Sequence, residues 1–251
     1  MIDHSPDAWF RCPRPKPGAA VTLFCFPYAG GGIPVFHSWA AALPDSIEVS
    51  SVQLPGRGTR LREEPFRQIT PLVQALTDAL IDVRSNEESV VFFGHSLGAL
   101  VAFEVARELR RRSQPIPMHL FVSGCSAPQD PYTDRLIHAL PDSDFLEEIR
   151  QWSGTPPEVL EHQELMALLL PALRADFEVR ETYSYQNEPP LPCSITAFGG
   201  LADHQVQRAS LDSWRAQTKE AFSLHMLPGD HFFLVESQAA LLELISQQVA
   251  G

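Results

Sequence analysis

Short runs of apolar and β-branched residues recur along the chain, separated by segments long enough to form a helix. Six runs have the length and composition of strands: Val21–Phe26, Glu48–Gln53, Ser89–Phe93, His119–Ser123, Ser194–Phe198 and Phe222–Leu227. They are nearly continuous rather than alternating, as is typical of strands that are covered on both faces. The pattern therefore predicts an α/β protein with a mostly parallel central sheet and helices on both faces.

The segments between these runs carry apolar residues at helical spacing. Helices are predicted at Pro34–Leu43, Pro71–Val83, Leu97–Arg111, Val206–Thr218 and Gln238–Val249. Each lies between two predicted strands or closes the chain, as crossover helices do. No internal repeat or low-complexity segment interrupts this order.

One stretch breaks the alternation of strand and helix. Residues 126–186 have helical periodicity and no good strand, and about sixty residues is far longer than an ordinary connection. We expect a helical cap, or lid, inserted into a core formed by residues 1–125 and 187–251, with breaks at Pro141, Pro156 and Pro157. Its apolar faces suit a substrate-lining lid and extra helices that simply pack on the core equally well.

Composition narrows the class of protein. A chain of 251 residues with 44% hydrophobic and 20% charged residues is an ordinary globular protein with one main core. The net charge of −12, with only 19 Lys and Arg, disfavours a nucleic-acid partner. No apolar run is long enough to span a membrane, and the polar N-terminal residues lack a signal-peptide core, so we expect a cytoplasmic protein.

The residues that commonly hold metals are scattered. Cys12, Cys25, Cys125 and Cys193 show no Cys-x-x-Cys spacing, and the nine histidines show no His-Glu-x-x-His pairing. We expect reduced thiols, no metal site and no cofactor.

A Gly94-His95-Ser96-Leu97-Gly98 pentapeptide lies between a predicted strand and a predicted helix. A serine in that position occupies a strained turn, and glycines flank it because side chains there would clash with the neighbouring strand and helix. The context predicts that Ser96 is the nucleophile of an α/β-hydrolase fold. The alternative is a Ser-Gly turn without catalytic consequence.

A serine hydroxyl needs a general base, and in this fold the residues follow in the order serine, acid, histidine. His231 comes directly after the last predicted strand, at the carboxyl edge of the sheet where such folds build their sites. His225 lies inside that strand, and His95 is expected to point away from Ser96. His231 is therefore the predicted base.

The acid that orients His231 is predicted to be Asp203, which follows the strand Ser194–Phe198 through a short loop. Asp230 adjoins the histidine, but neighbouring side chains in an extended loop usually diverge. Asp176 lies in the expected cap and Asp212 within a helix. The alternative role of Asp203 is an N-terminal cap for the helix that follows.

Backbone N–H groups are expected to bind the oxyanion of the tetrahedral intermediate. The positions are the residue after the nucleophile, Leu97, and the glycine-rich loop Phe26–Gly32, in which Ala29 is the candidate. A phosphate-binding role of these glycines is disfavoured because neither the Walker spacing nor Gly-x-Gly-x-x-Gly is present.

Several segments together resemble the type II thioesterases of nonribosomal peptide and polyketide synthases, almost from end to end. They are Trp9-Phe10-Arg11, Cys25–Gly31, Gln53-Leu54-Pro55-Gly56-Arg57, Gly94–Gly98, Leu173-Arg174-Ala175-Asp176 and Gly229–Phe233. The resemblance implies hydrolysis of acyl groups from the phosphopantetheine thiol of carrier proteins, which clears misprimed or stalled chains. We also expect a monomer without a nucleic-acid or membrane partner. Tyr28 stands where the family often has histidine and Leu97 where it often has methionine; we expect Tyr28 and Phe232 to contact substrate.

Two basic clusters compete as a docking surface for acidic carrier proteins. Arg110–Arg112 close the helix that begins after Ser96, about 20 Å from the catalytic edge, and suit the helix C-terminus. Arg57, Arg60 and Arg62 follow a strand on the catalytic side, and they form either a docking surface or a solvated loop.

Other activities remain open from the sequence alone. They are a medium-chain acyl-carrier-protein hydrolase of fatty-acid synthesis, a soluble carboxylesterase, an acyltransferase to an acceptor other than water, and an inactive module that binds carriers.

Overall fold

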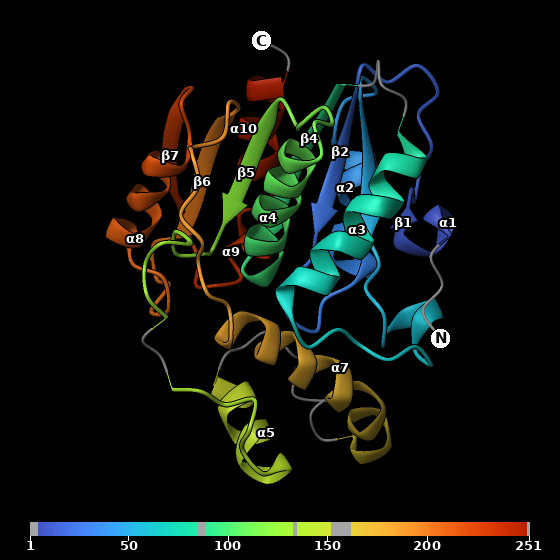
Figure 1. The fold of residues 1–251 in the computed structure, drawn as a ribbon, viewed down its shortest axis with the longest axis vertical. Coiled ribbons are helices and arrows are strands. Elements are labelled where there is room, and N and C mark those ends of the chain that lie inside the picture. Colours follow the sequence, from blue (N-terminus) through green and yellow to red (C-terminus); the bar gives the residue numbers. More distant parts are fainter. Residues whose placement is uncertain (1–4, 85–88, 133–134, 152–161, 250–251) are drawn as a thin grey trace.

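A computed structural model describes residues 5–84, 89–132, 135–151 and 162–249. Its centre is a seven-stranded sheet in the order β1-β3-β2-β4-β5-β6-β7 (Figure 1). The strands are β1 (Phe10–Arg11), β2 (Val21–Phe26), β3 (Ile47–Val52), β4 (Ser89–His95), β5 (His119–Ser123), β6 (Ser194–Gly200) and β7 (Phe222–Leu227). All neighbours pair in parallel except β1, which is antiparallel to β3.

The mostly parallel sheet is thus confirmed. Three strands have the predicted bounds, β3 is displaced by one residue, and β4 and β6 extend two residues further at their carboxyl ends. The pattern missed β1 because two residues are too few to show a periodicity.

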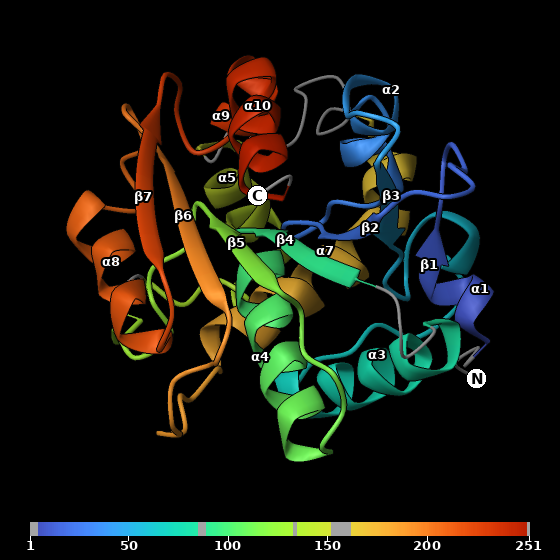
Figure 2. The same ribbon diagram turned by 90° about the horizontal axis from the view of Figure 1, so that it is seen from above.

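Helices cover both faces of the sheet (Figure 2). One face carries α3 (Ile69–Val83) and α4 (Leu97–Arg111), with α1 (Pro6–Trp9) against α3. The other carries α2 (Trp39–Ala42), α9 (Phe233–Glu236) and α10 (Gln238–Val249), while α8 (Arg208–Asp212) lies beside β6 and β7.

Alternate residues of the central strands pack into two separate apolar clusters. Phe24 and Phe92 face the cluster that contains α3 and α4, whereas Leu23, Val91 and Phe93 face the cluster that contains α10. Both faces of these strands are therefore buried, which explains their continuous apolar sequences.

Two predicted helices are wrong in extent. The segment predicted as Pro34–Leu43 is a 3-10 helix, Ile33–Phe36, followed by the single turn of α2. The segment predicted as Val206–Thr218 divides into α8 and a 3-10 helix, Ser213–Gln217. Tertiary contacts favour these breaks: Trp39 packs against Phe93 with ring centroids 4.8 Å apart, and the buried Trp214 indole donates to the Cys125 carbonyl at 2.8 Å.

Between residues 126 and 186 the described residues form two helices, α5 (Asp142–Gln151) and α7 (Gln163–Glu181). Both lie beyond the carboxyl ends of the parallel strands (Figure 1). They share a small apolar cluster of their own that includes Phe145, Met166 and Phe177. Pro141 immediately precedes α5, whereas the predicted breaks at Pro156 and Pro157 lie outside the described residues.

In the described part of the chain, no helix is both long enough and apolar enough to cross a membrane.

Candidate active site

Ser96 lies at the turn from β4 to α4 in a strained backbone conformation. Its φ of 52° and ψ of −118° are unusual for a residue with a side chain. A Cβ on Gly94 would lie 2.2 Å from the Gly98 carbonyl oxygen, and one on Gly98 would lie 2.1 Å from the Phe26 carbonyl oxygen. Only glycines allow strand, turn and helix to approach this closely, so the pentapeptide forms the tight turn that presents a serine at the sheet edge.

His231 and Asp203 come from loops that leave the carboxyl ends of β7 and β6. His231 Nδ1 lies 2.8 Å from Asp203 Oδ2, and both residues are buried. The other carboxylate oxygen, Asp203 Oδ1, accepts hydrogen bonds from the backbone N–H groups of Gln205 at 2.8 Å and Val206 at 3.1 Å. One aspartate thus shapes its own loop and also fixes the orientation of the histidine ring.

The environment keeps Asp203 ionised. Burial raises the pKa of the carboxyl group, but the hydrogen bond and charge of His231, together with the two backbone N–H donors, outweigh burial and leave the pKa below its usual value. A carboxylate in this position also selects the tautomer of His231 that carries its proton on Nδ1 and leaves Nε2 as an acceptor.

The other histidine and aspartate candidates have different partners. His95 Nδ1 lies 2.9 Å from Ser123 Oγ, and burial holds the pKa of this imidazole well below its usual value, with smaller effects of His231 and Arg180. His225 lies inside β7 and stacks on Phe198 of the neighbouring strand β6. Asp230 accepts from the backbone N–H of Phe232 at 2.7 Å, in a local turn.

The loop Phe26–Gly32 passes close to this edge of the sheet. Gly30 N–H donates to Asp176 Oδ2 at 2.7 Å, and Gly31 N–H donates to the Tyr28 carbonyl at 2.8 Å. For the backbone N–H groups of Ala29 and Leu97, by contrast, no acceptor is found among the described residues. These two N–H groups are the ones that sequence reasoning selected as oxyanion donors.

The proposed docking role of Arg57 and Arg60 is wrong. Both side chains are buried, Arg57 against Asp176 at 2.6 Å and Arg60 against Glu63 at 2.7 Å. A buried and paired guanidinium cannot also bind a partner surface; of the three predicted arginines only Arg62 is exposed.

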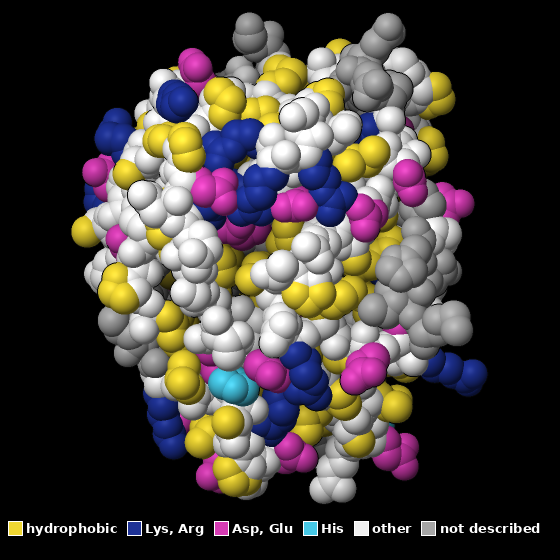
Figure 3. Space-filling view, viewed as in Figure 1, with side chains coloured by type: hydrophobic (Ala, Val, Ile, Leu, Met, Phe, Trp, Pro, Cys, Tyr) yellow, Lys and Arg dark blue, Asp and Glu magenta, His cyan; other side chains and the backbone are white. Residues whose placement is uncertain are grey.

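The basic cluster Arg110–Arg112 at the end of α4 is neutralised by nearby carboxylates. Arg110 and Arg111 pair with Glu188, and Arg112 pairs with Glu108 and Asp78. Figure 3 shows basic and acidic side chains interspersed in the same way across this face of the molecule.

An apolar cavity of about 360 Å³ adjoins the glycine-rich loop. Tyr28 and Ala29 line it from the loop, and Met166, Leu169 and Leu173 line it from α7. The predicted contact residue Tyr28 is therefore part of a cavity wall. Phe232 is not in that wall; its ring packs edge-on against Tyr28 with centroids 5.0 Å apart.

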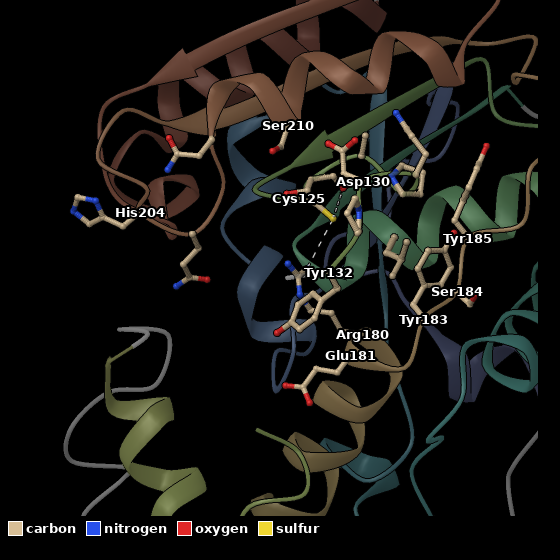
Figure 4. Close-up of a pocket in the computed structure, with 18 residues that line it drawn as sticks. Cys125, Asp130, Tyr132, Arg180, Glu181, Tyr183, Ser184, Tyr185, His204 and Ser210 are labelled. Carbon is tan, nitrogen blue, oxygen red and sulfur yellow. Dashed lines mark hydrogen bonds between the residues drawn. The ribbon is translucent and has the colours of Figure 1, made fainter. Parts of the chain in front are cut away.

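A second cavity, of about 670 Å³, lies between the loop after β5, the loop that contains Asp203 and the C-terminal end of α7 (Figure 4). Hydrogen-bonding groups dominate its wall: Ser126, Gln129, Tyr132, Arg180, Ser184, His204, Gln205 and Ser210. In Figure 4 Arg180 lies between Tyr132 and Cys125, with its guanidinium 5.7 Å from the Tyr132 ring and its Nη1 4.0 Å from Cys125 Sγ.

Arg180 has few partners for its donors. Its Nε is buried without a hydrogen-bond partner, and among the described residues no carboxylate lies within the 4.0 Å of an ion pair. A guanidinium with unsatisfied N–H groups in a polar cavity is suited to bind carbonyl, carboxylate or phosphate oxygens of a ligand.

Within the described residues no group of three or more histidine, cysteine, aspartate or glutamate side chains is placed to hold a metal ion.

The parallel sheet with helices on both faces, the strained serine turn after β4 and the histidine–aspartate pair at the same edge define an α/β-hydrolase. The model of the thioesterase domain family matches residues 21–249, and the chain belongs to that family.

Individual relatives agree with this assignment. The chain is 46% identical to the gramicidin S biosynthesis protein GrsT of Aneurinibacillus migulanus, over 96% of this chain and 93% of that protein. It is 40% identical to thioesterase PikA5 of Streptomyces venezuelae, over 90% of this chain and 80% of that protein. The solved structure of BorB, a type II thioesterase from the borrelidin biosynthetic cluster, superposes with a TM-score of 0.88 at 36% identity and covers 98% of this chain and 99% of its own. The protein is thus a type II thioesterase of the kind found with nonribosomal peptide and polyketide synthases.

Proposed function

We propose that this thioesterase hydrolyses acyl groups from the phosphopantetheine thiol of carrier domains, with Ser96 as nucleophile, His231 as general base and Asp203 as the acid that orients it. The observation that carries the proposal is the His231–Asp203 hydrogen bond of 2.8 Å at the same sheet edge as the strained Ser96 turn. Removal of acyl chains from carriers would free a synthase that holds a misprimed or stalled intermediate.

The reaction proceeds in two acyl-transfer steps. His231 Nε2 accepts the proton of Ser96 Oγ while Oγ attacks the thioester carbonyl carbon, and the carbonyl electron pair moves onto oxygen. The N–H groups of Leu97 and Ala29 bind that oxyanion. On collapse the carbon–sulfur bond breaks, and the thiolate takes the proton from His231. Water then attacks the Ser96 ester in the same way and releases the free acid.

The two cavities suit the two halves of the substrate. The apolar cavity beside Tyr28 is lined by Ala29, one of the two proposed oxyanion donors, and fits an acyl chain. The polar cavity near Arg180 fits the pantetheine arm, whose amide groups and hydroxyl group need hydrogen-bond partners. Residues 126–186 contribute α7 to both walls, which supports a role of this segment as a cap over a core formed by residues 1–125 and 187–251.

The protein is proposed to work as a cytoplasmic monomer. Its four cysteines are all unpaired, in keeping with a reducing compartment.

A comparison of substrates tests the proposed function. The same acyl group is offered on a holo carrier protein, on free pantetheine and as an aryl ester, and kcat/KM is measured for each. We expect the carrier-bound thioester to be the best substrate. A higher kcat/KM for the aryl ester would favour a carboxylesterase, and a preference limited to medium-chain acyl carriers would favour the fatty-acid alternative.

Arg180→Met is expected to raise KM for acyl-pantetheine about 10-fold, because hydrogen bonds to charged groups are worth about 1.5–3 kcal/mol. The aryl ester, which lacks the arm, should keep its KM. Arg135→Met provides a control, since Arg135 is an exposed arginine that pairs with Glu148. An equal loss for both substrates would show that Arg180 does not bind the arm.

A further inference from the structure

A buried ion pair joins α7 to the turn after β3. Arg57 Nη1 and Nη2 donate to Asp176 Oδ2 and Oδ1 at 2.6 and 2.7 Å. The two side chains are only 6% and 5% exposed, and their residues are separated by 119 positions in the sequence. Neither residue takes part in the proposed acyl-transfer steps.

Both partners also bind the glycine-rich loop. Asp176 Oδ2 accepts the N–H of Gly30 at 2.7 Å, and Arg57 Nη1 donates to the carbonyl of Gly31 at 3.1 Å. Gly30 has a φ of +77°, and a Cβ there would lie 2.8 Å from the Leu173 side chain of α7. The loop is thus held at two consecutive residues, immediately after Ala29.

We infer that Arg57 and Asp176 are positioning residues that fix the loop so that Ala29 N–H points at the oxyanion; this inference rests on the proposed function. Asp176 accepts the N–H of Gly30, so this donor is not available to another acceptor. The N–H of Ala29 stays unbonded among the described residues. The ion pair therefore determines which N–H of the loop is available to substrate.

Stability alone gives a weak reason for such a pair. The cost of removing two charges from water largely cancels their attraction, and an apolar pair of similar volume is often as stable. Catalysis is more demanding, because an oxyanion donor has to be held to within about 0.5 Å. Loss of one such donor typically lowers kcat by about 10²- to 10³-fold.

The test replaces both charges with apolar side chains. Arg57→Met with Asp176→Leu removes the buried charges together and so avoids leaving one of them unpaired. Asp176→Asn is the conservative companion, which keeps the volume and one carbonyl oxygen. The matched control is Arg67→Met with Glu178→Leu, because Arg67 and Glu178 pair at 2.7 Å between α7 and the same connection from β3 to α3, and both are partly exposed.

Each variant is assayed for thermal unfolding, for kcat and KM, and for the inhibition constant of a trifluoromethyl ketone analogue of the acyl group, whose adduct carries the oxyanion. We expect the Arg57/Asp176 double variant to fold, to keep KM within about 3-fold, to lose about 10²-fold in kcat and to bind the ketone about 10²-fold more weakly. The control should keep all of these values.

A double variant that folds with unchanged kcat and ketone affinity would overturn the inference, and so would equal losses in the control. If the double variant does not fold, kcat and the ketone inhibition constant of Asp176→Asn decide whether the ion pair positions the loop. Ser96→Ala is measured in parallel: its inactivity together with an active double variant would refute only the positioning role, whereas an active Ser96→Ala would refute the proposed function itself.

Discussion

Ser96→Ala is expected to lower kcat for acyl-thioester hydrolysis by about 10⁴-fold or more, with little change in the unfolding temperature. The substitution removes only the hydroxyl group, and alanine adopts the strained backbone of this turn, with its φ of 52°, at about the same cost as serine. The measurement is thiol release from an acyl-pantetheine, together with labelling by a fluorophosphonate probe.

Ser113→Ala is the matched control for this variant. Ser113 also has a positive φ, of 56°, but it lies exposed just after the C-terminus of α4, far from the sheet edge that carries Ser96. It should retain full activity and labelling. If Ser96→Ala remained active or labelled, the nucleophile would have to be another residue.

Asp203→Asn is expected to lower kcat by about 10³- to 10⁴-fold. The carboxylate accepts three N–H groups, from His231, Gln205 and Val206. An amide has a single oxygen, so its NH₂ group has to face a donor either at the histidine or in the loop. Either His231 then loses the acceptor that orients its ring, or Gln205 and Val206 lose the acceptor that holds the loop in its turn.

Asp230→Asn is the control, because Asp230 adjoins His231 in sequence but accepts only a local backbone N–H. Its kcat should change by less than about 10-fold. A greater loss in Asp230→Asn than in Asp203→Asn would reverse the assignment of the acid.

The same carboxylate affects the pH dependence of stability. Because the folded protein lowers the pKa of Asp203, its stabilising contribution is complete above the unfolded value of about 3.9 and is lost as pH falls through the lower folded value. The free energy of unfolding, measured with urea between pH 3 and 6, should therefore fall less on acidification for Asp203→Asn than for the wild type. If the free energy of unfolding fell equally with pH in both proteins, folding would not lower the pKa of Asp203.

The sequence was sufficient to predict an element where a local pattern of residues determines the local structure. The continuous apolar runs at Val21–Phe26 and His119–Ser123 gave strands with the observed bounds, because both faces of these strands are buried. Chain order placed Ser96, Asp203 and His231 at the ends of β4, β6 and β7, and parallel strands bring those ends to one edge.

Long-range contacts set the limit of sequence reasoning. Arg57 was interpreted as a surface charge because its partner Asp176 lies 119 residues away, and no spacing rule connects the two. The signal was present only in the family resemblance, where both residues belong to motifs. The breaks around Trp39 and Trp214 likewise depend on tertiary partners that periodicity does not contain.

Intact-protein mass spectrometry of holo carrier proteins loaded with a panel of acyl groups tests directly whether Ser96 hydrolyses carrier-bound thioesters. Each loaded carrier is incubated with the wild-type protein or with Ser96→Ala, and the loss of the acyl mass from the pantetheine arm is followed. We expect deacylation by the wild type, with the holo carrier and free acid as products, and no deacylation by Ser96→Ala. Carriers that stay loaded in the presence of wild-type protein, while that protein hydrolyses simple esters, would contradict the proposed function.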